Sequence, residues 1–265
     1  MGACTYCGKS AGLFRTFHQE CADGATQQAA AVAPKQAAKK VIKDPSPSVS
    51  VSRSSDRKEQ SQAEEIVVFD VQTSGLDPSS HSIIQFAGLA VEIPSWRELE
   101  TLEVKIRCDE AKADPEALRV NRYDRELWKK EAVTEAAALT TITRFLERHA
   151  TLEKRSRAGE PYNVARLCGH NSRFGAEFLY RWFKRADEFL PAAAYEALDT
   201  LALSHWCTSR LGRQESPADH KLATLCSWCG IPQPSPGDAL THVQATTRLA
   251  KSLLGRLRSA IPEDS

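Results

Sequence analysis

The chain has 265 residues and a formal net charge of +1, with 42% hydrophobic and 26% charged residues. That length allows one sizeable core plus an appendage, and the composition is ordinary for a soluble globular protein. No run approaches the ~18 apolar residues that a membrane helix needs, and the first residues lack the basic and then apolar pattern of a signal peptide. We therefore expect no membrane partner and a cytoplasmic location.

The charge is unevenly distributed. Residues 24–62 hold seven Lys and Arg against three Asp and Glu, residues 1–23 balance, and the total of +1 then leaves −3 for the rest. The stretch 24–62 is rich in Ala, Gln, Ser, Lys and Pro, so it cannot bury enough apolar surface to offset the entropy of ordering it. We predict a flexible basic linker over 24–62, a mildly acidic large domain over 63–258 and a tail over 259–265.

Residues 1–23 carry a cluster of metal-ligand types. Three thiols and one imidazole follow the spacing C-x2-C-x10-H-x2-C, in Cys4, Cys7, His18 and Cys21. These four groups complete a tetrahedral Zn²⁺ shell with no open position, which is typical of a structural site. We therefore predict a small zinc-binding unit with a recognition role, for nucleic acid or for protein. Cys226 and Cys229 have the same C-x2-C spacing but no second pair, and we expect them to pack in the core.

The large domain alternates between strand and helix patterns. The apolar run 66–70 ends in Asp70 and is typical of a buried central strand, and 82–92 and 102–107 continue it as a meander. A helix is predicted near 135–149, a short strand at 165–168, and a helix after it with Phe174, Phe178 and Trp182 at helical spacing. Further helices are predicted near 200–209, 221–229 and 238–257. The order predicts an α/β fold with a mixed sheet and flanking helices.

Three segments resemble motifs of a known family. IVVFDVQTSGLDPSSHSIIQFAGLAVE is similar to the first motif of the DEDDh 3′–5′ exonucleases, FD-x-E-T-T-G-L-D-P followed by I-I-Q/E-I-A. LCGHNSRFGAEFL resembles their second motif, HN-x-x-FD-x-x-FL, and GDALTHVQATTRLAKSLL resembles the last, H-x-A-L-x-D-A-x-A-T. The family includes the proofreading subunit of the bacterial replicative polymerase, ribonuclease T and oligoribonuclease. The resemblance runs from about Glu64 to Leu257 and implies a ribonuclease H-like exonuclease fold.

The same resemblance implies a degenerate active site. Family members hold two Mg²⁺ ions with four carboxylates and activate water with a histidine. At these five positions, in chain order, this chain has Asp70, Gln72, Gly175, Gly237 and His242. Only the first of them keeps the family's residue. Hard cations need anionic oxygen ligands, so hydrolysis by the two-metal mechanism is expected to be lost, and Mg²⁺ or Mn²⁺ is expected only in an active protein.

A rescued metal site is one alternative. Asp238 and His242 are four residues apart on the last predicted helix and share a face, so with Asp70 they form a candidate site for one transition metal. The competing interpretation makes Asp238 the N-cap of that helix, and Asp199 is likewise expected to cap a helix. His170 and Asn171 keep the family's HN pair, which the resemblance makes architectural or substrate-facing.

Three functions remain open, in this order. The first is an inactive exonuclease-like module that binds single-stranded nucleic acid or a 3′ end. The second is a protein–protein adaptor on the same fold, and the third is an active 3′–5′ exonuclease with a rearranged metal site. We expect all five tryptophans to lie in the core. Exposure of one of them on a basic surface would favour nucleic-acid binding.

Overall fold

The protein is described from a computed structural model, which covers residues 64–209 and 215–260. The predicted zinc ligands Cys4, Cys7, His18 and Cys21, and the predicted linker over 24–62, lie outside these ranges. Across the two described ranges, no helix has the length and apolar character needed to cross a membrane.

A five-stranded sheet in the order β3-β2-β1-β6-β7 forms the centre of the domain. β1 pairs antiparallel with β2 and parallel with β6, which makes it the middle strand. Its apolar run is buried on both faces, as central strands require. The strands span Glu64–Thr73 (β1), Ile83–Ile93 (β2), Arg97–Lys105 (β3), Arg166–Gly169 (β6) and Leu198–Asp199 (β7).

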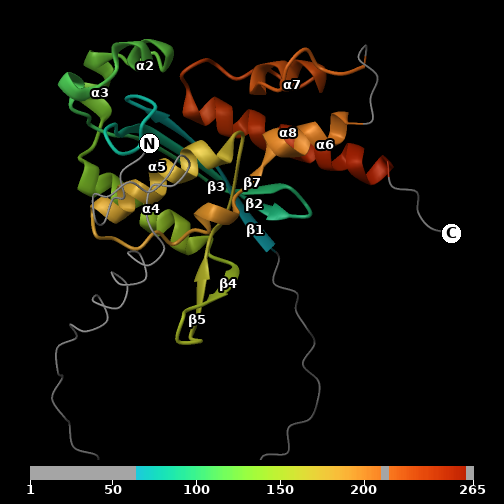
Figure 1. Cartoon of the computed structure of the whole chain (residues 1–265), viewed down its shortest axis with the longest axis horizontal. Helices are drawn as coiled ribbons and strands as arrows, with labels where there is room; N and C mark the ends of the chain where they lie inside the picture. The colour runs from blue at the N-terminus through green and yellow to red at the C-terminus, as the bar shows by residue number, and fades with distance from the viewer. Residues whose placement is uncertain (1–63, 210–214, 261–265) are drawn as a thin grey trace, which may run out of the picture. The chain divides into compact units, whose positions relative to one another are not determined.

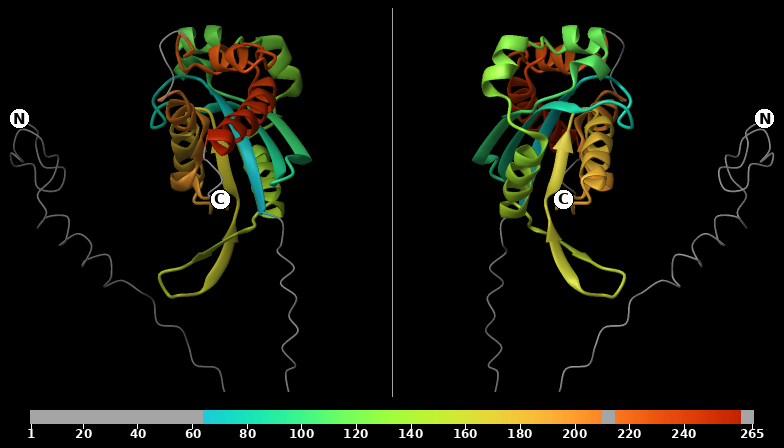
Figure 2. Two further views of the ribbon diagram at one scale, coloured as in Figure 1. Left: turned by 90° about the vertical axis from the view of Figure 1, so that its right-hand side faces the viewer. Right: turned by 90° about the vertical axis from the view of Figure 1, so that its left-hand side faces the viewer.

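Helices cover both faces of this sheet (Figures 1 and 2). On one face, α4 (Glu135–Arg148) and α5 (Ser172–Arg185) bury their apolar stripes against Val67, Phe69 and Val71 of β1. On the other face, α8 (Ala239–Ala260) packs on the alternate residues of the same strand. α6 (Thr200–Thr208) and α7 (Leu222–Trp228) lie beside α8 and share its second apolar cluster. The alternation of side chains along β1 therefore assigns each residue to one helical layer.

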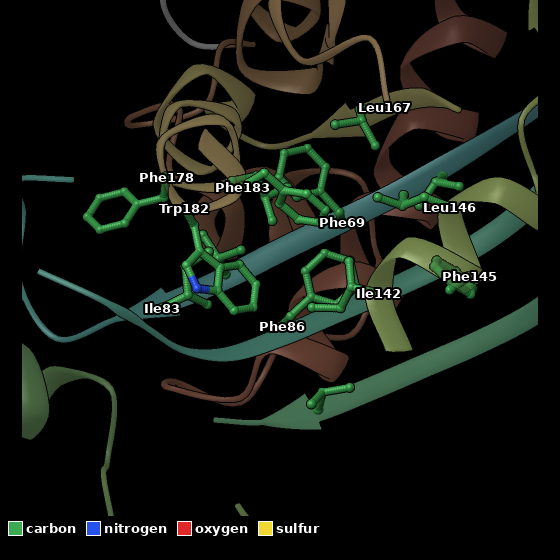
Figure 3. Close-up of a cluster of buried hydrophobic side chains, with 14 of the residues drawn as sticks. Phe69, Ile83, Phe86, Ile142, Phe145, Leu146, Leu167, Phe178, Trp182 and Phe183 are labelled. Carbon is green, nitrogen blue, oxygen red and sulfur yellow. The ribbon is translucent and has the colours of Figure 1, made fainter. Parts of the chain in front are cut away.

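The larger core lies between the sheet and the α4–α5 layer (Figure 3). Phe86 of β2, Phe145 of α4 and Phe178 and Trp182 of α5 are almost completely buried there. Large aromatic side chains of this kind contribute much of the burial that stabilises a domain. The helical stripe predicted after the strand at 165–168 is therefore the stripe that forms this core.

Two regions differ from the sequence-based prediction. The polar stretch after β3 contains three short helical turns, each begun by an aspartate whose carboxylate accepts a backbone N–H. These are η1 (Glu110–Lys112), α2 (Pro115–Val120) and α3 (Arg125–Glu131). A separate hairpin of β4 (Leu152–Arg155) and β5 (Pro161–Val164) follows α4. Elements this short show too few periodic positions to be distinguished from loops.

The predicted α/β fold with a mixed sheet and flanking helices is confirmed, and so is the burial of Cys226. The expectation that all tryptophans lie in the core is wrong for Trp206, which is 74% exposed on α6. The remaining cysteine of the C-x2-C pair, Cys229, is partly exposed and packs against the cluster formed by α7 and α8.

Candidate functional site

Two of the predicted site residues, Asp70 and Gln72, lie at the carboxyl end of β1, on the face covered by α8. Asp70 and Gln72 are two residues apart on the strand and therefore point to the same face. The Gln72 side chain is buried, with 7% of the residue exposed, and its amide Nε2 donates to Oδ2 of Asp70 over 2.6 Å. An ionised carboxylate only accepts hydrogen bonds, so the neutral amide meets it as a donor, where a second carboxylate would repel it.

His242 reaches the same carboxylate from the first turn of α8. Its Nδ1 lies 3.3 Å from Oδ2 of Asp70, with about a quarter of each side chain exposed. Burial lowers the pKa of His242, but the hydrogen bond and charge of Asp70, the charge of Asp238 and the nearby Ser235 backbone outweigh it. The net effect raises the pKa of His242 above 6.5 and favours the imidazolium form. Gln72 and His242 thus converge on one oxygen of Asp70.

Asp238 is engaged elsewhere. Its Oδ1 accepts hydrogen bonds from the backbone N–H groups of Leu240 at 3.0 Å and Thr241 at 3.1 Å. That is the geometry of a helix N-cap, so Asp238 starts α8 and its carboxylate acts on His242 through charge alone. Of the three residues in the alternative metal site, the structure pairs Asp70 with His242 and commits Asp238 to the helix end.

Gly175 lies in the first turn of α5, against β1. A Cβ added there would lie 2.8 Å from Cε2 of Phe69 and 3.3 Å from Cγ2 of Val71. Both side chains project from the face of β1 opposite to Asp70 and Gln72, into the larger core. A side chain at 175 therefore requires the buried Phe69 ring to move.

Gly237, which the sequence resemblance aligned with a histidine of the exonucleases, is enclosed more tightly. Its φ of +72° is in the region that favours glycine, and a Cβ there would lie 2.6 Å from the backbone carbon of Asn121. Asn121 caps α2, and its Nδ2 donates to the carbonyl of Thr73 at the end of β1 over 2.7 Å. The loop before α8 is therefore packed backbone to backbone against α2, with no room for a histidine.

His170 is held within the fold. Its Nε2 donates to the carbonyl of His220 at 3.0 Å, and its Nδ1 lies 3.0 Å from the hydroxyl of Thr200. Burial lowers the pKa of His170, although the charges of Asp199 and Asp70 act against this. The neutral ring therefore joins β6 to α6 and the loop before α7, which is an architectural role.

Asn171 presents its side chain to solvent from a left-handed backbone position (φ 55°) at the start of α5. Its backbone N–H donates to Oδ1 of Asp199 at 2.9 Å, and that of Ser172 donates to Oδ2 at 3.1 Å. Asp199 also accepts from the backbone N–H of Leu201 at 2.9 Å, as the predicted cap of α6. One carboxylate therefore caps two helices. The sequence indicated only the second of these roles.

The donor set does not fit a pair of divalent cations. The corner formed by Asp70, Gln72 and His242 offers one carboxylate, and one of its oxygens already accepts from an amide and an imidazole. Within 64–209 and 215–260, no three or more His, Cys, Asp or Glu side chains gather closely enough to hold a metal ion. Mg²⁺ demands octahedral oxygen ligands, which these side chains do not supply.

Comparison with known proteins supports the fold assignment. No protein-family model and no curated protein matches the chain. Among solved structures, E. coli exonuclease I in complex with a dT13 oligonucleotide matches with a TM-score of 0.59 and 18% identity, over 74% of this chain and 42% of that one. Exonuclease I from Methylocaldum szegediense matches with a TM-score of 0.55 and 19% identity, over 74% of this chain and 41% of that one.

The chain therefore spans about two fifths of the length of these structures. The likeness shows that the domain shares the fold of exonuclease I, at an identity low enough that it establishes the fold alone.

Proposed function

We propose that the domain binds single-stranded nucleic acid or its 3′ end at the corner formed by Asp70, Gln72 and His242, without hydrolysing it. The observation that carries this proposal is the convergence of Gln72 Nε2 and His242 Nδ1 on Oδ2 of Asp70. These two donors occupy the carboxylate oxygen that would otherwise be offered to a metal.

The charge at this corner differs from that of a two-metal site. Four carboxylates repel phosphate until cations neutralise them. Here one carboxylate faces one imidazole whose pKa is raised, so the pair is close to neutral while His242 is protonated. A phosphate can therefore approach without a metal ion, because the like-charge repulsion is largely removed.

The fold comparison is consistent with this ligand class. E. coli exonuclease I, which shares the fold, has been solved with dT13 and dA16 oligonucleotides bound. We extend that ligand class to this chain on the basis of the shared fold and the neutral corner. Hydrolysis is not carried over, because three of the four carboxylate positions and the histidine position hold other residues.

Fluorescence anisotropy with labelled oligothymidylate and oligouridylate tests the proposal, with product length followed on gels in the same samples. We expect equal affinity in EDTA and in Mg²⁺ or Mn²⁺, and no shortening. Shortening that EDTA and Asp70→Asn both abolish would establish a rearranged nuclease and overturn the proposal. Absence of binding under all conditions would also overturn it and favour the protein adaptor.

A double variant sharpens this test. Gln72→Glu with His242→Asp places three carboxylates at the corner and leaves both constrained glycines untouched. We expect its affinity for the oligonucleotide in EDTA to fall by about tenfold or more. A repulsive contact between two like charges 4 Å apart costs about 1 kcal/mol in bulk water and about 4 kcal/mol near a protein surface. Ala136→Glu with Ala137→Glu, at exposed positions of α4 on the opposite face of the sheet, serves as a control for added acidic residues. If the two double variants behave alike, the neutral corner is not the source of affinity.

A further inference from the structure

Helix α8 has an unusual charge content for this mildly acidic domain. Its 22 residues, Ala239–Ala260, include four Lys and Arg and no Asp or Glu. Arg248, Lys251 and Arg258 are exposed, and no carboxylate of the described ranges forms an ion pair with any of them. Spaced three and seven residues apart, they fall on one outward-facing side of the helix. This side is called the basic face of α8 below.

The same part of α8 adjoins the exposed tryptophan. Trp206 of α6 is 74% exposed and borders an apolar cavity of about 340 Å³. Ala250 and Leu254 of α8 line this cavity together with Leu203 of α6. Leu254 lies one helical turn before Arg258, and Ala250 is the neighbour of Lys251. The indole therefore lies at the edge of the basic face of α8 (Figure 1 shows α6 alongside α8).

The polar groups around this cavity already have partners. The carboxylate of Asp199 accepts from three backbone N–H groups. The hydroxyl of Thr200 contacts the Gly169 carbonyl and the His170 ring. Glu64 and Arg166 pair with each other at 2.7 Å. A nucleobase placed here would find an apolar wall and an aromatic face but few free groups to read its edges. Recognition by stacking is tolerant of sequence, because every base has a π-face.

We propose that the basic face of α8 and Trp206 form a second contact surface for single-stranded nucleic acid, in which Arg248, Lys251 and Arg258 bind phosphates and Trp206 stacks on a base. The inference rests on the proposed function and extends it. α8 begins beside the Asp70–His242 corner and carries its cations away from it, since His242 and Arg258 are about 24 Å apart along the helix at ~1.5 Å per residue. Because His242 faces β1 and the cations face outward, a strand whose end lies at the corner reaches the basic face by crossing over α8.

The charge component is tested with Arg248→Glu/Lys251→Glu, assayed by anisotropy with an oligothymidylate of ~20 nucleotides, long enough to span both surfaces. Lys129→Glu/Lys130→Glu on α3 is the matched control, because it makes the same charge change on another exposed helix. We expect the α8 variant to lose at least about tenfold in affinity, and its log K against log salt slope to fall by about 1.4, as two lost contacts on a single strand imply. The control should stay within about twofold of the natural protein.

The stacking component is tested with Trp206→Ala and Trp206→Phe. We expect about a tenfold loss for alanine, recovery with phenylalanine, and no loss for either on a strand of abasic nucleotides, which has phosphates but no bases. Both variants should melt as the natural protein does, because the side chain is exposed. Binding by the natural protein that the α8 and Trp206 variants leave unchanged would overturn this inference while the proposed function stands. Failure of the natural protein to bind any oligonucleotide would overturn both this inference and the proposed function.

Discussion

Nδ1 of His242 lies 3.3 Å from Oδ2 of Asp70, so the start of α8 is joined to the carboxyl end of β1 by a pair whose strength depends on protonation. Because this contact raises the pKa of His242, its stabilising effect is complete below the unfolded value of 6.5 and is lost as the pH rises through the folded value. We predict that His242→Gln lowers the melting temperature more at about pH 6 than at about pH 9.

The Asp70→Asn variant is the control for this experiment. It removes the carboxylate charge, so it should also lower the melting temperature more at about pH 6 than at about pH 9. Adding His242→Gln to this variant should then change the melting temperature little at either pH. A destabilisation by His242→Gln that grows as the pH rises would contradict the assignment of a cationic imidazole.

Gly237 should tolerate no side chain. Gly237→Ala carries the strain of a positive φ, about 1–2 kcal/mol for a residue with a Cβ, plus the overlap with the Asn121 backbone. Gly230→Ala is the matched control, because Gly230 has a similar φ of +67° and open space around its added Cβ. We expect urea denaturation to show a clearly larger loss for Gly237→Ala, and a larger one again for Gly237→His. Equal losses of unfolding free energy at the two glycines would show that the Asn121 backbone moves away from an added Cβ without measurable cost.

Gly175 provides a similar comparison within helices. Replacing an exposed helical glycine with alanine stabilises by about 1 kcal/mol, and Gly255 of α8 has nothing near its added Cβ. We predict that Gly255→Ala raises the free energy of unfolding, whereas Gly175→Ala lowers it because Phe69 must move. A gain at both positions would mean that the core accommodates a Cβ at 175 without cost.

Asp199 should contribute more to the stability of the domain than an ordinary helix cap does. Loss of a single N-cap costs about 0.5–2 kcal/mol, and Asp199 accepts from the first turns of both α5 and α6. We expect Asp199→Ala to destabilise more than Asp124→Ala, since Asp124 caps only α3. Chemical denaturation of the two variants side by side measures the difference, and similar losses would mean that the α5 contact contributes little.

The zinc unit remains a prediction from Cys4, Cys7, His18 and Cys21 alone. Elemental analysis should find one Zn²⁺ per chain, and Cys4→Ser should reduce that content sharply. The melting of the large domain should be unaffected by chelation if the unit is separate from it. Burial raises the pKa of the Cys168 thiol to about 12, so this cysteine should stay unreactive toward alkylating reagents before and after chelation. A zinc-free protein would exclude the predicted site.

The sequence predicted the fold well because its signals are local and strong. The apolar run around Phe69 and the helical spacing of Phe174, Phe178 and Trp182 each depend on a single periodicity. The order of the motifs then fixed the topology. The short turns near Asp114 and Asp124 were missed, since a helix of six or seven residues displays less than two turns of pattern.

The site was predicted only as a list of positions. Its chemistry depends on which atoms meet, and no sequence pattern indicates that Gln72 and His242 share one oxygen of Asp70. The contact of Gly237 with Asn121 joins residues more than a hundred positions apart. The exposure of Trp206 was also unforeseen, because the apolar residues Leu201, Ala202 and Leu203 earlier in α6 favoured a buried helix.

The contact between Gly237 and Asn121 also constrains the order in which a nuclease site could be introduced by successive substitutions. A histidine at 237 is of use only after the backbone at 121 has moved, and that movement disturbs the hydrogen bond from Asn121 to Thr73 before any catalytic benefit exists. Changing Gln72 and His242 to carboxylates meets no such backbone contact. An aspartate at 175, however, requires the buried Phe69 ring to move, so two carboxylates are accessible by substitution and the third is not. Selection for activity starting from this chain would therefore favour a base at a position other than 237.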